Sequence, residues 1–445
     1  MARLDALAPV VADIDAHALR PTGFPSPGWD RFAVAVGPEL EPLAWDRAVA
    51  RLSTLDGIDW PAVALLGGPD PDVSPGAASG ADVARANGLG PAIDDHRIEV
   101  AGRAQLLRGH RGVLDHPGCH RSNAEHATAL VRLAAVGTPL VAVDLPRPVL
   151  GLLGPHVQSV LRSRRAEDVL ADLTDATLRE RWSVLLRRAA LRDHAGRDWH
   201  RPVSIVLATR RADFLDLALS QVARQDHDAL ELVLALHGDD FPDDVVARVD
   251  AAVDLAFEVV RVDAALTLGD ALNAGVAAAS GEVVTKFDDD DWYGDAHVTD
   301  LLLALHYAQA DLVGKAAEFV HLAGSGAAQP AAQPAAQPAA GDAAGVTLRR
   351  RMGHAEDTST TLAGGTLTMH REALRDLGGF AAVSLGEDQR LIADVASAGG
   401  TTYRTHGFGY LLHRHGSHAW DVDPSAFLEQ ADEQRPGRDH DWSLT

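Results

Sequence analysis

The chain has 445 residues, which is too long for one ordinary hydrophobic core, so two domains are expected. Its formal net charge of −23, from 63 acidic and 40 basic residues, argues against a general nucleic-acid binder and against binding to anionic lipid through a basic face. The single cysteine, Cys119, excludes an internal disulfide and a cysteine cage for zinc, and it favours a reducing compartment.

The first residues do not resemble a signal peptide. Aspartates interrupt the stretch 1–19 before an apolar core can form. No apolar stretch approaches the roughly 20 residues that a membrane-spanning helix needs. We therefore expect a cytoplasmic protein without a transmembrane segment.

The first half alternates short apolar runs with segments of helical spacing. Strands are expected at 31–37, 60–68, 111–117 and 139–146, and helices at 42–55 and 123–137. This rhythm predicts a parallel sheet, and hence a Rossmann-like βαβ module over 1–165. A charged, leucine-rich segment at 166–199 is expected to be a helical linker.

A second α/β rhythm begins at Pro202. Strands are expected at 202–210, 229–238, 281–287 and 310–322, and helices at 212–225, 268–281 and 295–310. The segment 322–346 contains three tandem Ala-Ala-Gln-Pro repeats, which favour a low-complexity surface insertion because they cannot build a core. The second domain is predicted over 200–425, with a C-terminal tail at 426–445.

Four consecutive aspartates, Asp288–Asp291, follow the apolar strand VVTKF. Adjacent carboxylates repel one another unless solvent screens them or a cation neutralises them. Mg²⁺ and Mn²⁺ prefer carboxylate oxygens, and ligands of open α/β sheets usually bind at the carboxyl ends of the strands. The alternative is a solvated acidic loop.

Four motifs in order resemble the family 2 glycosyltransferases of GT-A fold, over about half of the chain from Val203 onward. They are the opening strand and turn VSIVLATRRADF, the segment LGDALNAGVAAASGEVVTKFDDDDWYG, the loop and helix AGGTLTMHREALRDLGGF, and LGEDQRLIADVASAGG with its Glu-Asp pair. The resemblance implies an inverting, metal-dependent glycosyltransferase of hexosyltransferase type. Such an enzyme moves a sugar from a nucleoside-diphosphate donor to a hydroxyl acceptor, which would be a glycan or a metabolite.

The resemblance also implies roles for particular residues. A divalent metal, Mn²⁺ or Mg²⁺, would be held by Asp288 and Asp290, carried over as the Asp-x-Asp pair. In some GT-A enzymes a late histidine completes the metal site, and His415 and His418 are the candidates. The base that deprotonates the acceptor would be Asp388, with Glu387 as the alternative. The residues expected at the nucleotide-sugar are Thr209, Arg210, Asn273, Lys286, Asp288, Asp289, Gly364 and Gly365.

One departure from the family pattern concerns the nucleotide base. The second strand of the family often ends in Asp-Asp-Gly-Ser, whose acid contacts the base, whereas His237-Gly238 stands at that place here. This difference keeps open a second function, a non-catalytic nucleotide- or carbohydrate-binding protein that retains the GT-A shell. A nucleotidyltransferase is disfavoured because the turn after the first strand, ATRRADF, lacks glycine.

The first half shows a weaker resemblance, to the nucleotide-binding half of GT-B glycosyltransferases. It rests on the segment 111–146, which contains one βαβ unit. His120, Arg121 and Ser122 would occupy the helix N-terminus that faces a diphosphate in that family. Because only one unit matches, we expect a scaffold or binding module rather than a second catalytic centre.

Overall fold

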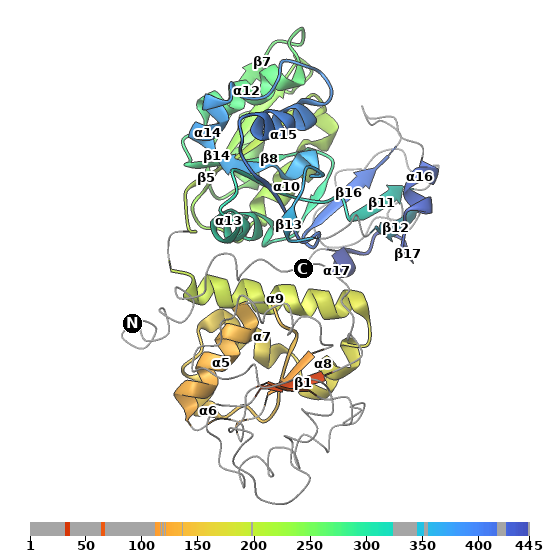
Figure 1. Ribbon diagram of the computed structural model, residues 1–445. Coiled ribbons are helices and arrows are strands. Elements are labelled where there is room, and N and C mark those ends of the chain that lie inside the picture. Colours follow the sequence, from red (N-terminus) through yellow and green to blue (C-terminus); the bar gives the residue numbers. More distant parts are fainter. Residues whose placement is uncertain are drawn as a thin grey trace, which may run out of the picture. The chain divides into compact units, whose positions relative to one another are not determined.

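The computed structural model describes residues 32–35, 64–66, 112–115, 117, 120, 122–135, 137–196, 199–323, 345–350, 355–415 and 424–443. The chain divides into two compact units, Met1–Arg197 and Asp198–Thr445 (Figure 1). The expected helix at 42–55, the repeats at 327–338 and His418 lie outside the described residues.

The first unit contains a four-stranded parallel sheet in the order β2-β1-β3-β4. Its strands are β1 (Phe32–Ala35), β2 (Ala64–Leu66), β3 (Gly112–Asp115) and β4 (Leu140–Ala142). Helix α5 (Asn123–Ala135) connects β3 to β4, so the expected βαβ unit is present there. The assignment of the whole module as Rossmann-like stays a prediction.

The segment predicted as a linker belongs to the first unit instead. It forms helices α8 (Ala166–Asp172) and α9 (Ala176–His194), after α6 (Arg147–Leu150) and α7 (Pro155–Ser163). The Asp175 carboxylate caps α9 by accepting hydrogen bonds from the backbone N–H groups of Thr177 and Leu178. The indole of Trp182 donates to the Leu140 carbonyl at 2.8 Å, so α9 is held against β4. Helix α9 therefore packs within the first unit, and the predicted linker bounds stay a prediction.

The second unit is built on an eight-stranded sheet in the order β13-β15-β10-β14-β8-β5-β6-β7. Strands β5, β6, β7 and β8 are parallel, and β14 runs antiparallel between β8 and β10. Their bounds are β5 (Val203–Thr209), β6 (Leu230–His237), β7 (Ala256–Val262), β8 (Val283–Phe287), β10 (Leu312–Lys315), β13 (Asp357–Thr358), β14 (Thr368–His370) and β15 (Thr402–Thr405).

Amphipathic helices pack on this sheet and form its core. Val206 and Val233 of the sheet pack with Leu272 of α12 and Leu391 of α15 in one buried cluster. A capping box between Thr267 and Asp270 begins α12. The helices are η3 (Ala212–Phe214), α10 (Leu215–Ala223), α11 (Val245–Ala252), α12 (Leu268–Ala278), α13 (His297–Ala308), η4 (Gly364–Thr366), α14 (Arg371–Asp376) and α15 (Glu387–Ser397).

A second sheet of five strands, in the order β17-β12-β11-β16-β9, lies beside the first in the same unit (Figure 1). Its strands are β9 (Trp292–Tyr293), β11 (Phe319–Ala323), β12 (Gly345–Arg349), β16 (Tyr410–Arg414) and β17 (Glu433–Pro436). The segment predicted as a tail supplies β17, after α16 (Pro424–Glu429) and before α17 (His440–Ser443). Because β17 pairs with β12 and Trp442 is 2% exposed, this segment is part of the fold.

The expectation of one strand over 310–322 is wrong. The segment forms β10 and β11, which belong to different sheets. The break follows Lys315, whose buried ammonium donates to Asp300 at 3.1 Å and to the Phe408 carbonyl at 2.6 Å. These partners satisfy a buried charge, and the chain then passes to the second sheet. Among the described residues, no helix has the length and apolar character needed to cross a bilayer.

Candidate active site

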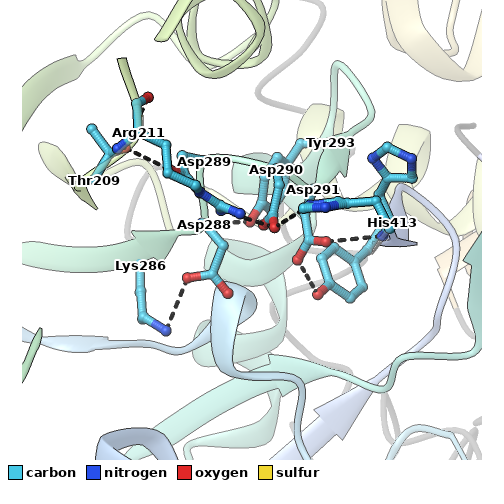
Figure 2. A network of polar contacts seen from close by, with 11 residues as sticks. Thr209, Arg211, Lys286, Asp288, Asp289, Asp290, Asp291, Tyr293 and His413 are labelled. Carbon is cyan, nitrogen blue, oxygen red and sulfur yellow. Dashed lines mark hydrogen bonds and ion pairs between the residues drawn. The ribbon is translucent and has the colours of Figure 1, made fainter. Parts of the chain in front are cut away.

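The acidic turn Asp288–Asp291 connects the two sheets of the second unit. It begins at the carboxyl end of β8, whose residues are all buried, and it ends at β9. Figure 2 shows the four carboxylates spread over this turn rather than pointing at one place. Each of them therefore has its own surroundings.

Asp289 and Asp290 face an arginine from the turn after β5. The Thr209 hydroxyl donates to Asp289, and the Arg211 guanidinium contacts both Asp289 and Asp290, the latter at 2.8 Å. Burial alone would lower the pKa of Arg211, but the two carboxylates raise it, so the arginine stays charged. This cation reduces the repulsion within the acidic turn.

Asp290 also contacts the histidine from the end of β16. The Nε2 atom of His415 lies 2.9 Å from Oδ2 of Asp290, and the His415 ring stacks on Phe214 with the centroids 5.1 Å apart. Two residues predicted to share a metal site, Asp290 and His415, are thus in contact.

Asp291 is directed into the protein. Its carboxylate accepts from the Tyr410 hydroxyl at 2.6 Å and from the backbone N–H of His413 at 3.0 Å. Burial, followed by the negative charges of Asp290 and Asp288, raises the pKa of Asp291 well above its ordinary value. The residue fastens the acidic turn to β16 and is not open to a ligand.

Asp288 lies on the other side of the turn, beside a buried lysine (Figure 2). The Lys286 ammonium is 3.0 Å from Oδ1 of Asp288 and 3.1 Å from Oε1 of Glu387, at the start of α15. Burial alone would lower the pKa of Lys286, but Asp288, Glu387 and Asp388 raise it. A charged lysine therefore joins the two carboxylate motifs that are about 100 residues apart in the sequence.

Two glycines separate Asp288 from Asp388. A Cβ atom on Gly364 would lie 2.3 Å from Oδ2 of Asp388, and one on Gly365 would lie 2.8 Å from Oδ2 of Asp288. A larger residue at either position would displace one of these carboxylates, so the two glycines let the backbone lie close to both. Asp388 accepts a hydrogen bond from the backbone N–H of Gln389 at 2.7 Å, whereas Glu387 is 4% exposed and paired with Lys286.

Two residues expected at the nucleotide have other partners. The Arg210 guanidinium donates to Nδ1 of His237 at 3.0 Å and to the Ala264 carbonyl at 2.9 Å. The Asn273 side chain donates to the Phe380 carbonyl and accepts from the Phe380 N–H, each at 2.8 Å. Asn273 thus holds α12 against the loop after α14, and Arg210 holds the ends of β6 and β7 together.

Arg211 was not among the residues predicted from the sequence. It lies in the turn after β5, next to the predicted Arg210, and contacts the acidic turn through Asp289 and Asp290. Tyr293 was missed as well. Its hydroxyl accepts from the N–H of Asp288 at 2.8 Å and donates to the Gly365 carbonyl at 3.0 Å, a pair of contacts that only the fold creates.

Replacing Tyr293 by phenylalanine tests this bridge. The change leaves the part-buried N–H of Asp288 and the buried carbonyl of Gly365 without this partner, so we expect the free energy of unfolding of the second unit to fall by about 1–3 kcal/mol. Urea denaturation measures it. Ser397→Ala is the control, since this exposed hydroxyl bonds only within α15 in the described structure. Equal stabilities of Tyr293→Phe and the wild type would contradict the bridge.

The second unit thus combines a mixed sheet with an acidic turn and a Glu-Asp pair that meet around Lys286. Residues 204–322 match the family model for glycosyl transferase family 2, which confirms the resemblance of the C-terminal half to that family. No curated protein matches the chain.

Solved structures of glycosyltransferases are similar to part of the chain. One is the mannosyltransferase PcManGT from Pyrobaculum calidifontis in complex with GDP-Man and Mn²⁺, with 18% identity, a TM-score of 0.37 and coverage of 52% of this chain. Another is TarS from S. aureus in complex with UDP-GlcNAc, with 17% identity, a TM-score of 0.36 and coverage of 51% of this chain. The match spans 63% of the length of each of these two structures.

Proposed function

We propose that the second unit is an inverting, metal-dependent glycosyltransferase that moves a sugar from a nucleoside-diphosphate donor to a hydroxyl acceptor. The observation that carries the proposal is the meeting of two carboxylate motifs, the acidic turn after β8 and the Glu387-Asp388 pair of α15, around Lys286 and Gly364-Gly365. The match of residues 204–322 to the family model supports it.

The donor set of the acidic turn fits a hard or borderline divalent cation. Asp290 and His415 already share a contact of 2.9 Å, and carboxylate oxygens and imidazole nitrogens are ligands that Mn²⁺ accepts. Among the described residues, no three metal-ligating groups at this turn bring their ligand atoms within 4.8 Å of one another. Asp290 and His415 would hold the ion. Asp288, the other member of the proposed Asp-x-Asp pair, is paired with Lys286 in this structure.

A bound cation would offset the negative charge that develops on the departing diphosphate. Arg211 contacts the same carboxylate oxygen of Asp290 as His415 does, so the guanidinium has to leave this oxygen when a metal binds. A phosphate group of the bound donor could then become the new partner of the Arg211 guanidinium. Lys286 of β8 forms ion pairs with Asp288 and Glu387 and so holds both carboxylates in place.

Asp388 is the proposed base. It takes the proton of the acceptor hydroxyl while the hydroxyl oxygen attacks the anomeric carbon on the face opposite the diphosphate, and this geometry inverts the configuration. Glu387 is a positioning residue for Asp388. Its carboxylate pairs with Lys286, and this ion pair holds the first turn of α15 in place.

The test is binding and turnover of a panel of nucleotide-sugars with and without Mn²⁺ or Mg²⁺, by calorimetry and by release of nucleoside diphosphate. Metal-dependent binding with slow hydrolysis is the expected result. Binding without turnover for every donor and acceptor tried would favour the alternative, a binding protein with a GT-A shell. One observation favours this alternative. At the place where the family usually has the acid that contacts the nucleotide base, this chain has His237, which is hydrogen-bonded to Arg210. Absence of any metal-dependent nucleotide binding would contradict the glycosyltransferase proposal.

Gly364→Ala is expected to lower turnover by about 10²-fold, because a displacement near 1 Å of a reacting group costs about that much. The added methyl group would push Asp388 from its position, since it would stand 2.3 Å from the carboxylate. Steady-state kinetics measures the effect. The matched control is Gly151→Ala, whose Cβ atom would meet its nearest neighbours at an ordinary 3.6 Å. Unchanged turnover in Gly364→Ala would remove Asp388 from the reaction.

A further inference from the structure

A second group of metal-ligating side chains lies in the first unit, apart from the residues of the proposed active site. It consists of Asp115, His120 and His126, which come from the end of β3, from the connection that follows, and from the first turns of α5. Their potential ligand atoms all lie within 4.8 Å of one another. We propose that these three residues bind a divalent transition-metal ion, with zinc as the first candidate.

The geometry brings both imidazoles to one carboxylate. Nε2 of His120 lies 2.7 Å from Oδ1 of Asp115, and Nε2 of His126 contacts Oδ2. The side chain of Asp115 is 0% exposed, and those of His120 and His126 are each 2% exposed. The convergence is therefore inside the unit, whereas chance groupings of such residues are usually found at the surface.

The two histidines approach the carboxylate side by side. Their imidazole rings stack with the centroids 4.3 Å apart and 13° between their planes. Both rings therefore present Nε2 to the two oxygens of one carboxylate, which is the arrangement that three ligands around one ion require.

The free positions of the rings agree with this arrangement. The Nδ1 atoms of both histidines have no hydrogen-bond partner in the described structure, whereas both Nε2 atoms face Asp115. Nε2 is therefore the atom that each ring would offer to an ion, and binding would release the proton that it carries.

The chemical class of the ion follows from the ligands. Imidazole nitrogen and one carboxylate oxygen suit Zn²⁺ and its neighbours Co²⁺, Ni²⁺ and Fe²⁺ better than Mg²⁺ or Ca²⁺, which prefer oxygen alone. Three protein ligands leave one coordination position for water or another group, as in the open zinc sites of proteins. The ion would tie the end of β3 to the start of α5.

The other such group, His200, His227 and Asp228 of the second unit, is a control and not a second proposal. The Asp228 side chain is 83% exposed, and a hydrogen bond of 2.5 Å to His200 accounts for its position.

The experiment uses the full chain, without a histidine tag, in the Asp290→Ala background, so that zinc at the acidic turn does not contribute. After removal of metals by a chelator, zinc alone is titrated and its stoichiometry is measured by mass spectrometry of the metal and by calorimetry. We expect one zinc ion per chain. Asp115→Asn and His126→Gln should each lower the affinity at least about tenfold, since even partners of metal ligands cost that much. His200→Gln should leave it unchanged.

A measurement on unmutated ligands guards against variants that fail to fold. Zinc should slow amide hydrogen exchange in peptides that cover 112–135, and Co²⁺ should give the visible absorption of a four-coordinate site. Any one of three results would overturn the proposal. The chain could retain no zinc, both substitutions could leave the affinity for zinc unchanged, or zinc could slow amide exchange only outside 112–135. Activity of the second unit does not enter any of these readings, so the proposed function can fail without affecting them.

Discussion

Replacing Asp290 by alanine is expected to reduce sugar transfer by about 10²- to 10³-fold and to abolish its dependence on Mn²⁺. The carboxylate is the group that contacts both His415 and Arg211, so its loss removes the centre of the proposed metal site. Metal-dependent donor binding, followed by calorimetry, should be lost together with turnover.

The same substitution should not destabilise the protein. Asp289, Asp290 and Asp291 are all at least 94% buried as residues and lie next to one another, so removing one charge relieves repulsion. The Arg211 guanidinium loses its contact with Asp290 but keeps its ion pair with Asp289, so no buried cation is left without a partner. The thermal midpoint of Asp290→Ala is therefore expected to equal or exceed that of the wild type. Asp295→Ala is the control, because this exposed residue pairs only with Arg224 at the surface. Wild-type turnover with intact metal dependence in Asp290→Ala would show that the proposed metal site is wrong.

Replacing Asp388 by asparagine is expected to reduce turnover by about 10²- to 10⁴-fold and to leave donor binding unchanged. Asparagine has nearly the same shape and can still accept the hydrogen bond from the Gln389 N–H, so the start of α15 should not move. What the variant lacks is a carboxylate that can take the acceptor proton. Rapid-quench kinetics and donor titration separate the two effects.

Glu387→Gln is the matched comparison, because it alters the neighbouring residue of the same motif. It removes one of the two carboxylates that pair with the buried Lys286, so we expect the free energy of unfolding to fall by about 1–3 kcal/mol. Asp388→Asn should show no such fall. If Glu387→Gln lost turnover without losing stability, and Asp388→Asn kept its turnover, the two roles would have to be exchanged.

Several features of the site could be predicted because they depend on short stretches of sequence. An apolar run followed by Asp288–Asp291 predicts a buried strand that ends in an acidic turn, and the structure has β8 and the turn at this place. Whether the predicted site residues act as proposed is not decided by these patterns. The match of residues 204–322 to the family model concerns the family and not the individual roles.

Other features needed the fold, because they depend on which elements pack together. The residues 166–199 have the composition of a linker, yet α9 buries its apolar face in the first unit. The residues 426–445 have no strong strand pattern, yet β17 pairs with β12 and forms the edge strand of the second sheet. Burial of an amphipathic face or pairing at a sheet edge is a property of two elements, and neither element encodes it alone.

The sequence by itself determined that strands and helices alternate from Pro202 to about residue 310, and it determined the acidic side chains that follow β8 and those of the Glu387-Asp388 pair. The tertiary structure alone decided which of these side chains are committed to partners. Glu387 is paired with Lys286, Asp291 with Tyr410, and Asp289 with Arg211, while Asp388 bonds its own helix turn. The physical reason is that a buried charge must find a partner, and the partners come from elements that meet only when the sheets assemble.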